Sequence, residues 1–143
     1  MFFDNDGFLC VSLGDKGRDE FQLASTQKLD GGLFGGIIRI DIDNDPSRSH
    51  PIRRHPLVNE APPADYAGWE TFSQRYSIPN DNPWLSPDST QLEEFYAIGL
   101  RSPYSVYYDK ETENIWVADV GSDIAEEINK VEYGDNLQWP RCF

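Results

Sequence analysis

The chain has 143 residues and a formal net charge of −13 at pH 7, from 25 acidic and 12 basic residues. That charge repels phosphate backbones, so we expect no nucleic-acid partner. Hydrophobic residues make up 38% of the chain and aromatic residues 13%, which predicts a packed domain rather than a disordered segment. No apolar run approaches the roughly 20 residues of a membrane-spanning helix, so we expect a soluble chain without a membrane span.

The first residues, MFFDNDGFLC, predict the end of one strand, a turn at residues 4–7 and a second strand. They lack the basic start and the long apolar region of a signal peptide. A chain that opens inside a hairpin and closes on NLQWPRCF is interpreted as a piece of a longer protein. Cys10 lies within the second strand and is expected to be a buried small apolar residue. Pairing with Cys142 is the weaker alternative.

Strand patterns recur along the rest of the chain. Alternating apolar and polar residues and the turn signals between them predict strands at residues 8–13, 36–42, 95–100, 103–109, 114–119 and 126–132. The clearest is the hairpin of SVYYDKETENIWVAD, where Tyr, Val and Trp alternate on either side of a polar turn. The best helix candidate is DSTQLEEFYAI, with Asp88 or Ser89 as its N-cap, but it runs at once into a strand-like segment.

Residues 43–92 lack these patterns and hold eight of the ten prolines. We predict that they form a long irregular loop inserted in a single domain of residues 1–143. The aromatic residues of this segment indicate that it packs down rather than extends into solvent; they are Tyr66, Trp69, Phe72, Tyr76 and Trp84.

Short strands separated by turns predict an all-β fold, either a sandwich or a propeller. The strand count gives about two four-stranded blades, whereas a closed propeller needs at least about four. Two blades alone would leave long unpaired sheet edges. The chain is therefore expected to be a fragment of a larger propeller or a small irregular β domain.

Two acidic motifs have ordinary structural interpretations. In LGDKGRDE, Gly14 and Gly17 flank an aspartate after a strand, which favours a tight loop, because the spacing fits no dinucleotide or phosphate loop. In IRIDIDNDP, acids alternate at Asp41, Asp43 and Asp45 as at the start of a calcium loop. Proline follows the third acid where a calcium loop needs glycine, so a strand that ends in an acidic turn is favoured.

The segment SRSHPIRRHP is the only basic island. Histidines beside arginines can perform acid–base catalysis. The prolines around them predict an extended, exposed segment, and no carboxylate or nucleophile is patterned with them. Catalysis is therefore not expected from either histidine, His50 or His55, of this island, whose arginines are Arg48, Arg53 and Arg54.

Two strand ends suggest a binding site. In an up-and-down meander, Arg101 precedes one strand and Gly121 follows the next, so both fall on the same edge of the sheet. Main-chain carbonyls around Gly121 and Ser122 can bind a hard cation such as Ca²⁺. A guanidinium beside that cation would match a planar polycarboxylate. The alternative is that Arg101 caps the carbonyls of its own turn.

At these residues the chain resembles the soluble glucose/sorbosone (aldose sugar) dehydrogenases that use pyrroloquinoline quinone (PQQ). Six segments carry the resemblance in order over nearly the whole chain: DGFLCVSLGDKG, LFGGIIRIDID, YSIPNDNPW, GLRSPYSV, ADVGSDIAEEIN and GDNLQWP. The resemblance implies a six-bladed β-propeller several times longer than this chain, of which these residues would form about two consecutive blades.

The resemblance also implies roles for single residues. Arg101 matches the family's arginine that contacts PQQ, and Ser102 is the adjacent cofactor-binding residue. The carbonyls of Gly121 and Ser122 match the positions that hold the Ca²⁺ bridging PQQ. Glu127 matches an acid that we expect to fix this loop.

Five positions depart from the family pattern. Ser102 replaces an asparagine, Ser122 a proline and Gly36 a lysine, and Leu137-Gln138 replaces the Tyr-Gly that precedes Trp-Pro. These departures bear on PQQ affinity more than on the fold.

For the full-length protein, the resemblance implies oxidation of an aldose or a related sugar alcohol carbon. A histidine takes the hydroxyl proton while hydride passes to PQQ, Ca²⁺ polarises the quinone, and Arg101 stabilises the negative charge on its oxygen. The family's catalytic histidine would lie upstream of Met1, so no catalytic residue is expected here and the fragment alone should be inactive. Electrons would leave to a cytochrome or quinone acceptor, and a periplasmic or secreted location is expected.

Two other functions fit the same residues. A non-catalytic extracellular propeller that binds a protein or glycan, as in the hedgehog-interacting proteins, is the main alternative, because the changes at Ser102 and Ser122 fit a lost cofactor site. A calcium-stabilised extracellular module rests only on acidity and the DIDND motif.

Overall fold

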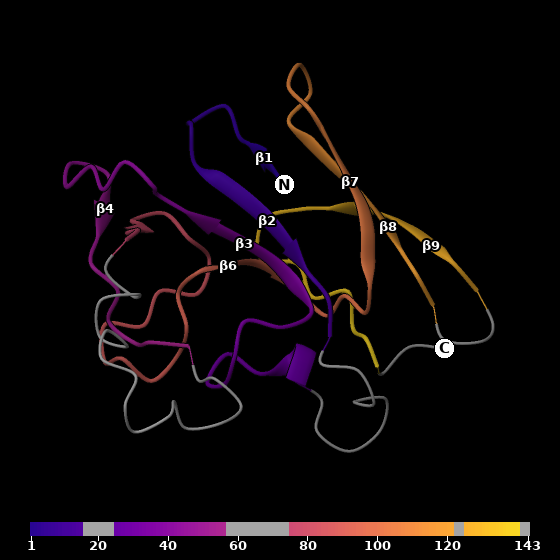
Figure 1. Cartoon of the computed structure of the whole chain (residues 1–143), viewed down its shortest axis with the longest axis horizontal. Helices are drawn as coiled ribbons and strands as arrows, with labels where there is room; N and C mark the ends of the chain where they lie inside the picture. The colour runs from indigo at the N-terminus through magenta and orange to yellow at the C-terminus, as the bar shows by residue number, and fades with distance from the viewer. Residues whose placement is uncertain (16–24, 57–74, 122–124, 141–143) are drawn as a thin grey trace, which may run out of the picture.

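The structure is a computed structural model that describes residues 1–15, 25–56, 75–121 and 125–140. Within these ranges the regular elements are nine β-strands and one 3₁₀ turn. This part of the chain contains no helix with the length and apolar character needed to cross a membrane. The strands form three antiparallel sheets, with the orders β1-β2-β3-β6, β7-β8-β9 and β4-β5. Figure 1 shows the four-stranded sheet beside the three-stranded sheet, with the β4–β5 pair at the far side of the larger sheet.

The elements run as follows: β1 Phe2–Phe3, β2 Leu9–Leu13, η1 Ser25–Gln27, β3 Gly36–Ile40, β4 Ser49–His50, β5 Ile78–Pro79, β6 Phe95–Ile98, β7 Pro103–Asp109, β8 Asn114–Asp119 and β9 Glu127–Val131. All the strands expected from the sequence are present, with ends within two residues of the prediction. The helix candidate is wrong. Its start is a turn in which the Ser86 hydroxyl accepts hydrogen bonds from the main-chain N–H of Thr90 and Gln91. Its end is strand β6, because Phe95 is fully buried in the sheet core.

The core lies on both faces of β3, because successive side chains of a strand point to opposite sides. One face holds Ile37 and packs with Val117 and Val131 of the three-stranded sheet. The other face holds Ile38 and Ile40, which pack with residues of β6 and of the segment before it. A single hydrophobic strand thus joins the two sheets on one side and anchors the proline-rich region on the other.

Part of the proline-rich segment has regular structure that the sequence did not indicate. Strands β4 and β5 pair through Ser49 with Pro79 and His50 with Ile78. Tyr76 and Trp84 pack against the core as expected, whereas Tyr66, Trp69 and Phe72 lie outside the described residues. The division of the chain at residues 43 and 92 stays a prediction.

The acidic motif forms the predicted turn at the end of a strand. The Asp41 carboxylate accepts hydrogen bonds from the main-chain N–H of Asp43 and Asp45, both at 2.9 Å, and from the Ser49 hydroxyl at 2.6 Å. These bonds hold the pKa of Asp41 below its ordinary value even though burial opposes the shift. The carboxylate is occupied by its own turn.

The basic island is less exposed than the sequence suggests. His50 Nε2 lies 3.1 Å and Arg53 Nη1 lies 2.9 Å from the carboxylate of Glu93, whose side chain is 2% exposed. The main-chain N–H of Ser86 also donates to Glu93, at 2.6 Å. The expectation of an extended, exposed segment holds for Pro51, Arg53 and His55. It is wrong for His50, which is 14% exposed because a buried carboxylate from a distant part of the chain needs a donor.

Candidate functional site

Arg101 lies between β6 and β7, and its side chain reaches across to the end of β8. Its Nη1 donates to the carbonyl oxygen of Val120 at 3.0 Å and to that of Gly121 at 2.8 Å. Arg101 and Gly121 therefore lie on one edge of the β7–β8–β9 sheet. The alternative was that the arginine caps the carbonyls of its own turn; the two carbonyls that Nη1 binds belong instead to the segment that follows β8.

The main chain at Arg101 is held by Asp119, the last residue of β8. The Asp119 carboxylate accepts hydrogen bonds from the N–H of Arg101 at 2.8 Å and of Ser102 at 2.6 Å. Burial raises the pKa of Asp119, and these two hydrogen bonds oppose the shift. The side chain of Asp119 thus fixes the backbone from which the guanidinium extends, and Ser102 takes part through its N–H.

A third part of the chain completes the surroundings of Arg101. The guanidinium carbon lies 5.4 Å from the ring centroid of Trp139, within the range of a cation–π contact. Trp139 Nε1 donates to the carboxylate of Asp15 at 3.2 Å, and the N–H of Asp15 donates to the carbonyl of Arg101 at 2.6 Å. Asp15 and Trp139, which are 124 positions apart in the chain, therefore both lie against Arg101.

The turn at Gly121 requires glycine. A Cβ atom at this position would overlap the carbonyl oxygen of Ala125. The N–H of Gly121 donates to the Glu126 carboxylate at 2.9 Å. At Gly121 the carboxylate that binds the turn is thus that of Glu126, while Glu127 accepts from Asn129. The expected role of Glu127 in the rest of the loop stays a prediction, because residues 122–124 lie outside the described residues. Ser122 lies outside the described residues.

The described residues fit an anionic cofactor beside a cation in two respects. Arg101 is a fixed guanidinium on the same edge as Gly121, and a carbonyl oxygen that accepts one hydrogen bond keeps a second lone pair. No group of three His, Cys, Asp or Glu side chains in the described ranges is placed to hold a metal ion. A cation at this edge would therefore depend on main-chain oxygens, which suit Ca²⁺.

Two of the departures from the family pattern have a local structural reason or cost. At Gly36, a Cβ would overlap the carbonyl oxygen of Ala97 and crowd the Phe95 ring, so a lysine would not fit this backbone. At Gln138, where the pattern has glycine, φ is +72°, a region that L-residues with side chains adopt at a cost of about 1–2 kcal/mol. The departure at Gly36 thus concerns the backbone of the core strand β3, and the departure at Gln138 concerns the backbone next to Trp139.

Sequence analysis missed three residues of the site: Asp119, Glu126 and Trp139. Asp119 ends a strand next to Gly121, and an acid in that place was a usable signal for a backbone-binding carboxylate. Trp139 belongs to the GDNLQWP segment that carries the resemblance, but nothing local indicated a role for it, because only the return of the chain after β9 brings it to Arg101. Cys10 is a free buried cysteine as expected, and Cys142 lies outside the described residues.

The fold defines the class of protein. A crystal structure of a glucose dehydrogenase superposes with a TM-score of 0.61 over 96% of this chain and 29% of that chain, at 22% identity. Together with the antiparallel sheets, this confirms the predicted fold class, part of an all-β propeller. The family model for glucose/sorbosone dehydrogenases matches residues 71–143, and the chain belongs to that family.

Two curated relatives match nearly the whole chain. The HIPL1 protein of Arabidopsis thaliana is 34% identical over 143 residues, and the HIPL2 protein of the same plant is 32% identical over 142 residues. Each alignment covers 97% of this chain and 18% of the relative. An uncharacterized protein of Synechocystis is 31% identical over 45% of the chain. The chain thus spans less than a fifth of the length of the two plant relatives.

Proposed function

We propose that this chain is part of a sugar dehydrogenase that depends on PQQ and Ca²⁺, and that Arg101 and Ser102 contribute to its cofactor site. Family membership supports a dehydrogenase, and the single observation that carries the assignment is the contact between the Arg101 guanidinium and the Gly121 carbonyl. That contact puts a fixed cation and a candidate metal ligand on one edge of the sheet. PQQ, when bound, supplies the acceptor for hydride from an aldose or related sugar.

The residues of this chain contribute binding and charge. Arg101 offers a permanent positive charge to a polycarboxylate, because a guanidinium keeps its proton in proteins. Asp119 keeps the backbone of Arg101 and Ser102 in place, so little reorganisation is needed when an anion arrives. The carbonyl oxygens of Gly121 and Ser122 would ligate Ca²⁺. The base that takes the sugar's hydroxyl proton belongs to a part of the protein outside this chain.

The test uses the full-length protein that contains this segment. PQQ binding with and without Ca²⁺ is followed by quenching of tryptophan fluorescence, and activity by dye reduction with aldoses. Arg101→Ala is expected to weaken PQQ binding more than tenfold, and Lys130→Ala, which removes an exposed positive charge that pairs with Glu132, should leave it unchanged. Unchanged PQQ binding in Arg101→Ala would contradict the assigned role.

A second candidate function is a non-catalytic extracellular propeller that binds a protein or a glycan, in a secreted or periplasmic protein. The observation in its favour is that Nη1 of Arg101 already donates to two carbonyls of its own sheet, which is the bonding of a structural arginine. The two plant relatives also carry HIPL names rather than a dehydrogenase name. A folded full-length protein that binds no PQQ in the presence of Ca²⁺ would favour this function over the dehydrogenase. The dehydrogenase, in contrast, would pass its electrons to a cytochrome or a quinone.

A further inference from the structure

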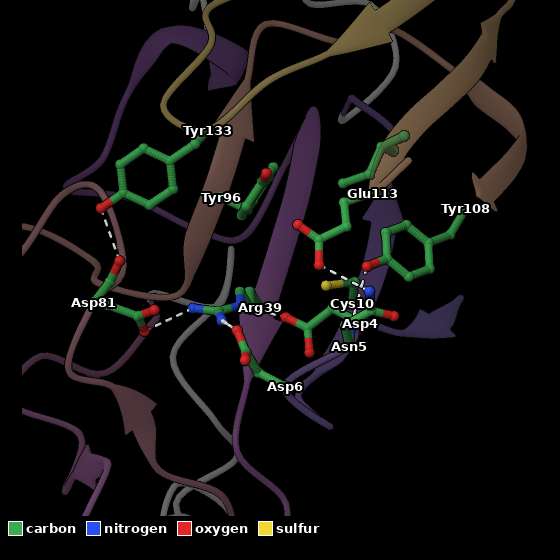
Figure 2. A pocket seen from close by; sticks show the side chains of 11 residues that line it. Asp4, Asn5, Asp6, Cys10, Arg39, Asp81, Tyr96, Tyr108, Glu113 and Tyr133 are labelled. Atoms are coloured by element: carbon green, nitrogen blue, oxygen red, sulfur yellow. Dashed lines mark hydrogen bonds and ion pairs between the residues drawn. The ribbon is translucent and has the colours of Figure 1, made fainter. Parts of the chain in front are cut away.

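A second site lies at the other end of strand β2 from Arg101. A cavity of about 210 Å³ opens between the β1–β2–β3–β6 sheet and the β7–β8 hairpin. Its walls include the turn between β1 and β2, Arg39 near the end of β3, and the segment that follows β9. In the close view of Figure 2, tyrosine rings face a row of carboxylates across this space. No part of the Arg101 site takes part in it.

The cavity has an excess of negative charge. Its lining holds four carboxylates and a single cation, Arg39. The Arg39 side chain is 5% exposed and donates through Nε to Asp4 at 2.6 Å. It donates through Nη1 to Asp81 at 2.7 Å and through Nη2 to Asp6 at 3.1 Å. Because each nitrogen of this guanidinium binds a carboxylate, Arg39 has little capacity for an anionic ligand.

Carboxylate oxygens remain at the mouth of the cavity. The side chains of Asp6 and Asp81 are 69% and 64% exposed, and each gives only one oxygen to Arg39. Glu113, from the β7–β8 hairpin, accepts a hydrogen bond from Asn5 Nδ2 at 2.8 Å through Oε1. The second oxygen of each group faces no donor among the described residues. These three acids therefore present acceptors to a molecule that enters from solvent.

Three tyrosine rings and a cysteine thiol form the neutral part of the lining. Tyr96 and Tyr133 meet edge to face with ring centroids 5.8 Å apart, and Tyr108 forms the wall on the hairpin side. Burial raises the pKa of Tyr96 to about 12 and that of Cys10 to about 12, so both stay protonated at neutral pH. Cys10 is 1% exposed, forms no disulfide in the described ranges, and directs its thiol into the cavity (Figure 2).

We propose that this cavity binds a small organic cation, an alkylammonium of the size of a short diamine. The ammonium group would pair with the carboxylates of Asp6, Asp81 and Glu113, while the alkyl chain and the positive charge contact the tyrosine rings. The acids do not converge as metal ligands, since no described group of three His, Cys, Asp or Glu is placed to hold a metal. The volume is below the range of about 300–1,000 Å³ that is typical of drug-sized ligands, which suits a short chain.

The test measures binding by calorimetry to the full-length protein, with three probes of equal chain length: diaminobutane, butanediol and succinate. The diamine alone is expected to bind saturably. Glu113→Gln should weaken its binding by about 3- to 10-fold. Glu111→Gln, on the same hairpin but outside the cavity, removes the same charge and should leave the affinity unchanged.

Three results would overturn the proposal: binding of butanediol as tight as that of the diamine, an equal loss in Glu111→Gln and Glu113→Gln, or displacement of the diamine by equimolar Ca²⁺. Circular dichroism of each variant checks that it is folded. Tyr96→Leu provides a second variant for the aromatic wall, and a loss of diamine binding in this folded variant would support the site. PQQ binding should be the same in all of these variants, so failure here is distinguishable from failure of the proposed dehydrogenase.

Discussion

The Nη1 atom of Arg101 lies 2.8 Å from the carbonyl oxygen of Gly121, twenty residues later in the chain. The length of the β7–β8 hairpin sets this contact, because the two strands leave the sheet edge and return to it in register. A guanidinium and a main-chain oxygen are thereby fixed at one point. Their position depends on the backbone that carries them, which the Asp119 carboxylate holds.

Replacing Asp119 with asparagine should destabilise the protein by about 1–3 kcal/mol. The carboxylate accepts from two main-chain N–H groups, and an amide can accept with only one of its two polar atoms. One of the two partly buried N–H groups would then face an amide donor. Urea unfolding of the full-length protein measures the change. Asp43→Asn, at an exposed aspartate, is the matched control, and an equal effect of the two substitutions would contradict the role of Asp119.

Replacing Gly36 with alanine should destabilise the fold by about 1–3 kcal/mol through overpacking. The new Cβ would overlap the carbonyl oxygen of Ala97 in the neighbouring strand, which cannot move without disturbing the β3–β6 pairing. Gly31→Ala is the control, because a Cβ there meets nothing within 4 Å and its φ is not positive. Thermal unfolding of both variants measures the difference, and equal stabilities would show that the strand accommodates the methyl group.

The stability of the protein should fall at higher pH through Glu94. Burial raises the pKa of this carboxyl, and its Oε2 has no hydrogen-bond partner in the described part of the chain, although Tyr76 donates to Oε1 at 2.9 Å. Since the folded state favours the protonated form, the contribution of Glu94 is fully present below its unfolded-state pKa. It is lost as the pH rises through the folded-state pKa.

The Glu94→Gln variant isolates this effect, because glutamine keeps the shape and stays neutral at every pH. The free energy of unfolding in urea, measured from pH 4 to pH 8, should decline less in Glu94→Gln than in the natural protein. Glu111→Gln, at an exposed position of the β7–β8 turn, should follow the natural pH dependence. If the free energy of unfolding had the same pH dependence in the natural protein and in Glu94→Gln, ionisation of Glu94 would not destabilise the folded state.

The strands were predictable because their signal is local. Apolar residues alternate with a period of two in β2, β7 and β8, and turn residues mark their ends. The sequence alone also placed Arg101 and Gly121 on one edge, since a meander returns to the same edge after each hairpin. The two-residue strands β4 and β5 have no such period, and only pairing across about thirty residues forms them.

The partners of the polar groups were decided by the tertiary structure. No local pattern links Trp139 to Arg101 or Glu93 to His50. Each pair forms only when distant segments of the chain pack together, because a polar side chain buried by that packing needs a hydrogen-bond or ionic partner. That Glu126 binds the N–H of Gly121 depends on how the chain turns just before β9, which begins at Glu127. The sequence by itself thus determined the strands and the edge that carries Arg101. Packing between the sheets determined which charges meet, including the acidic cavity around Arg39.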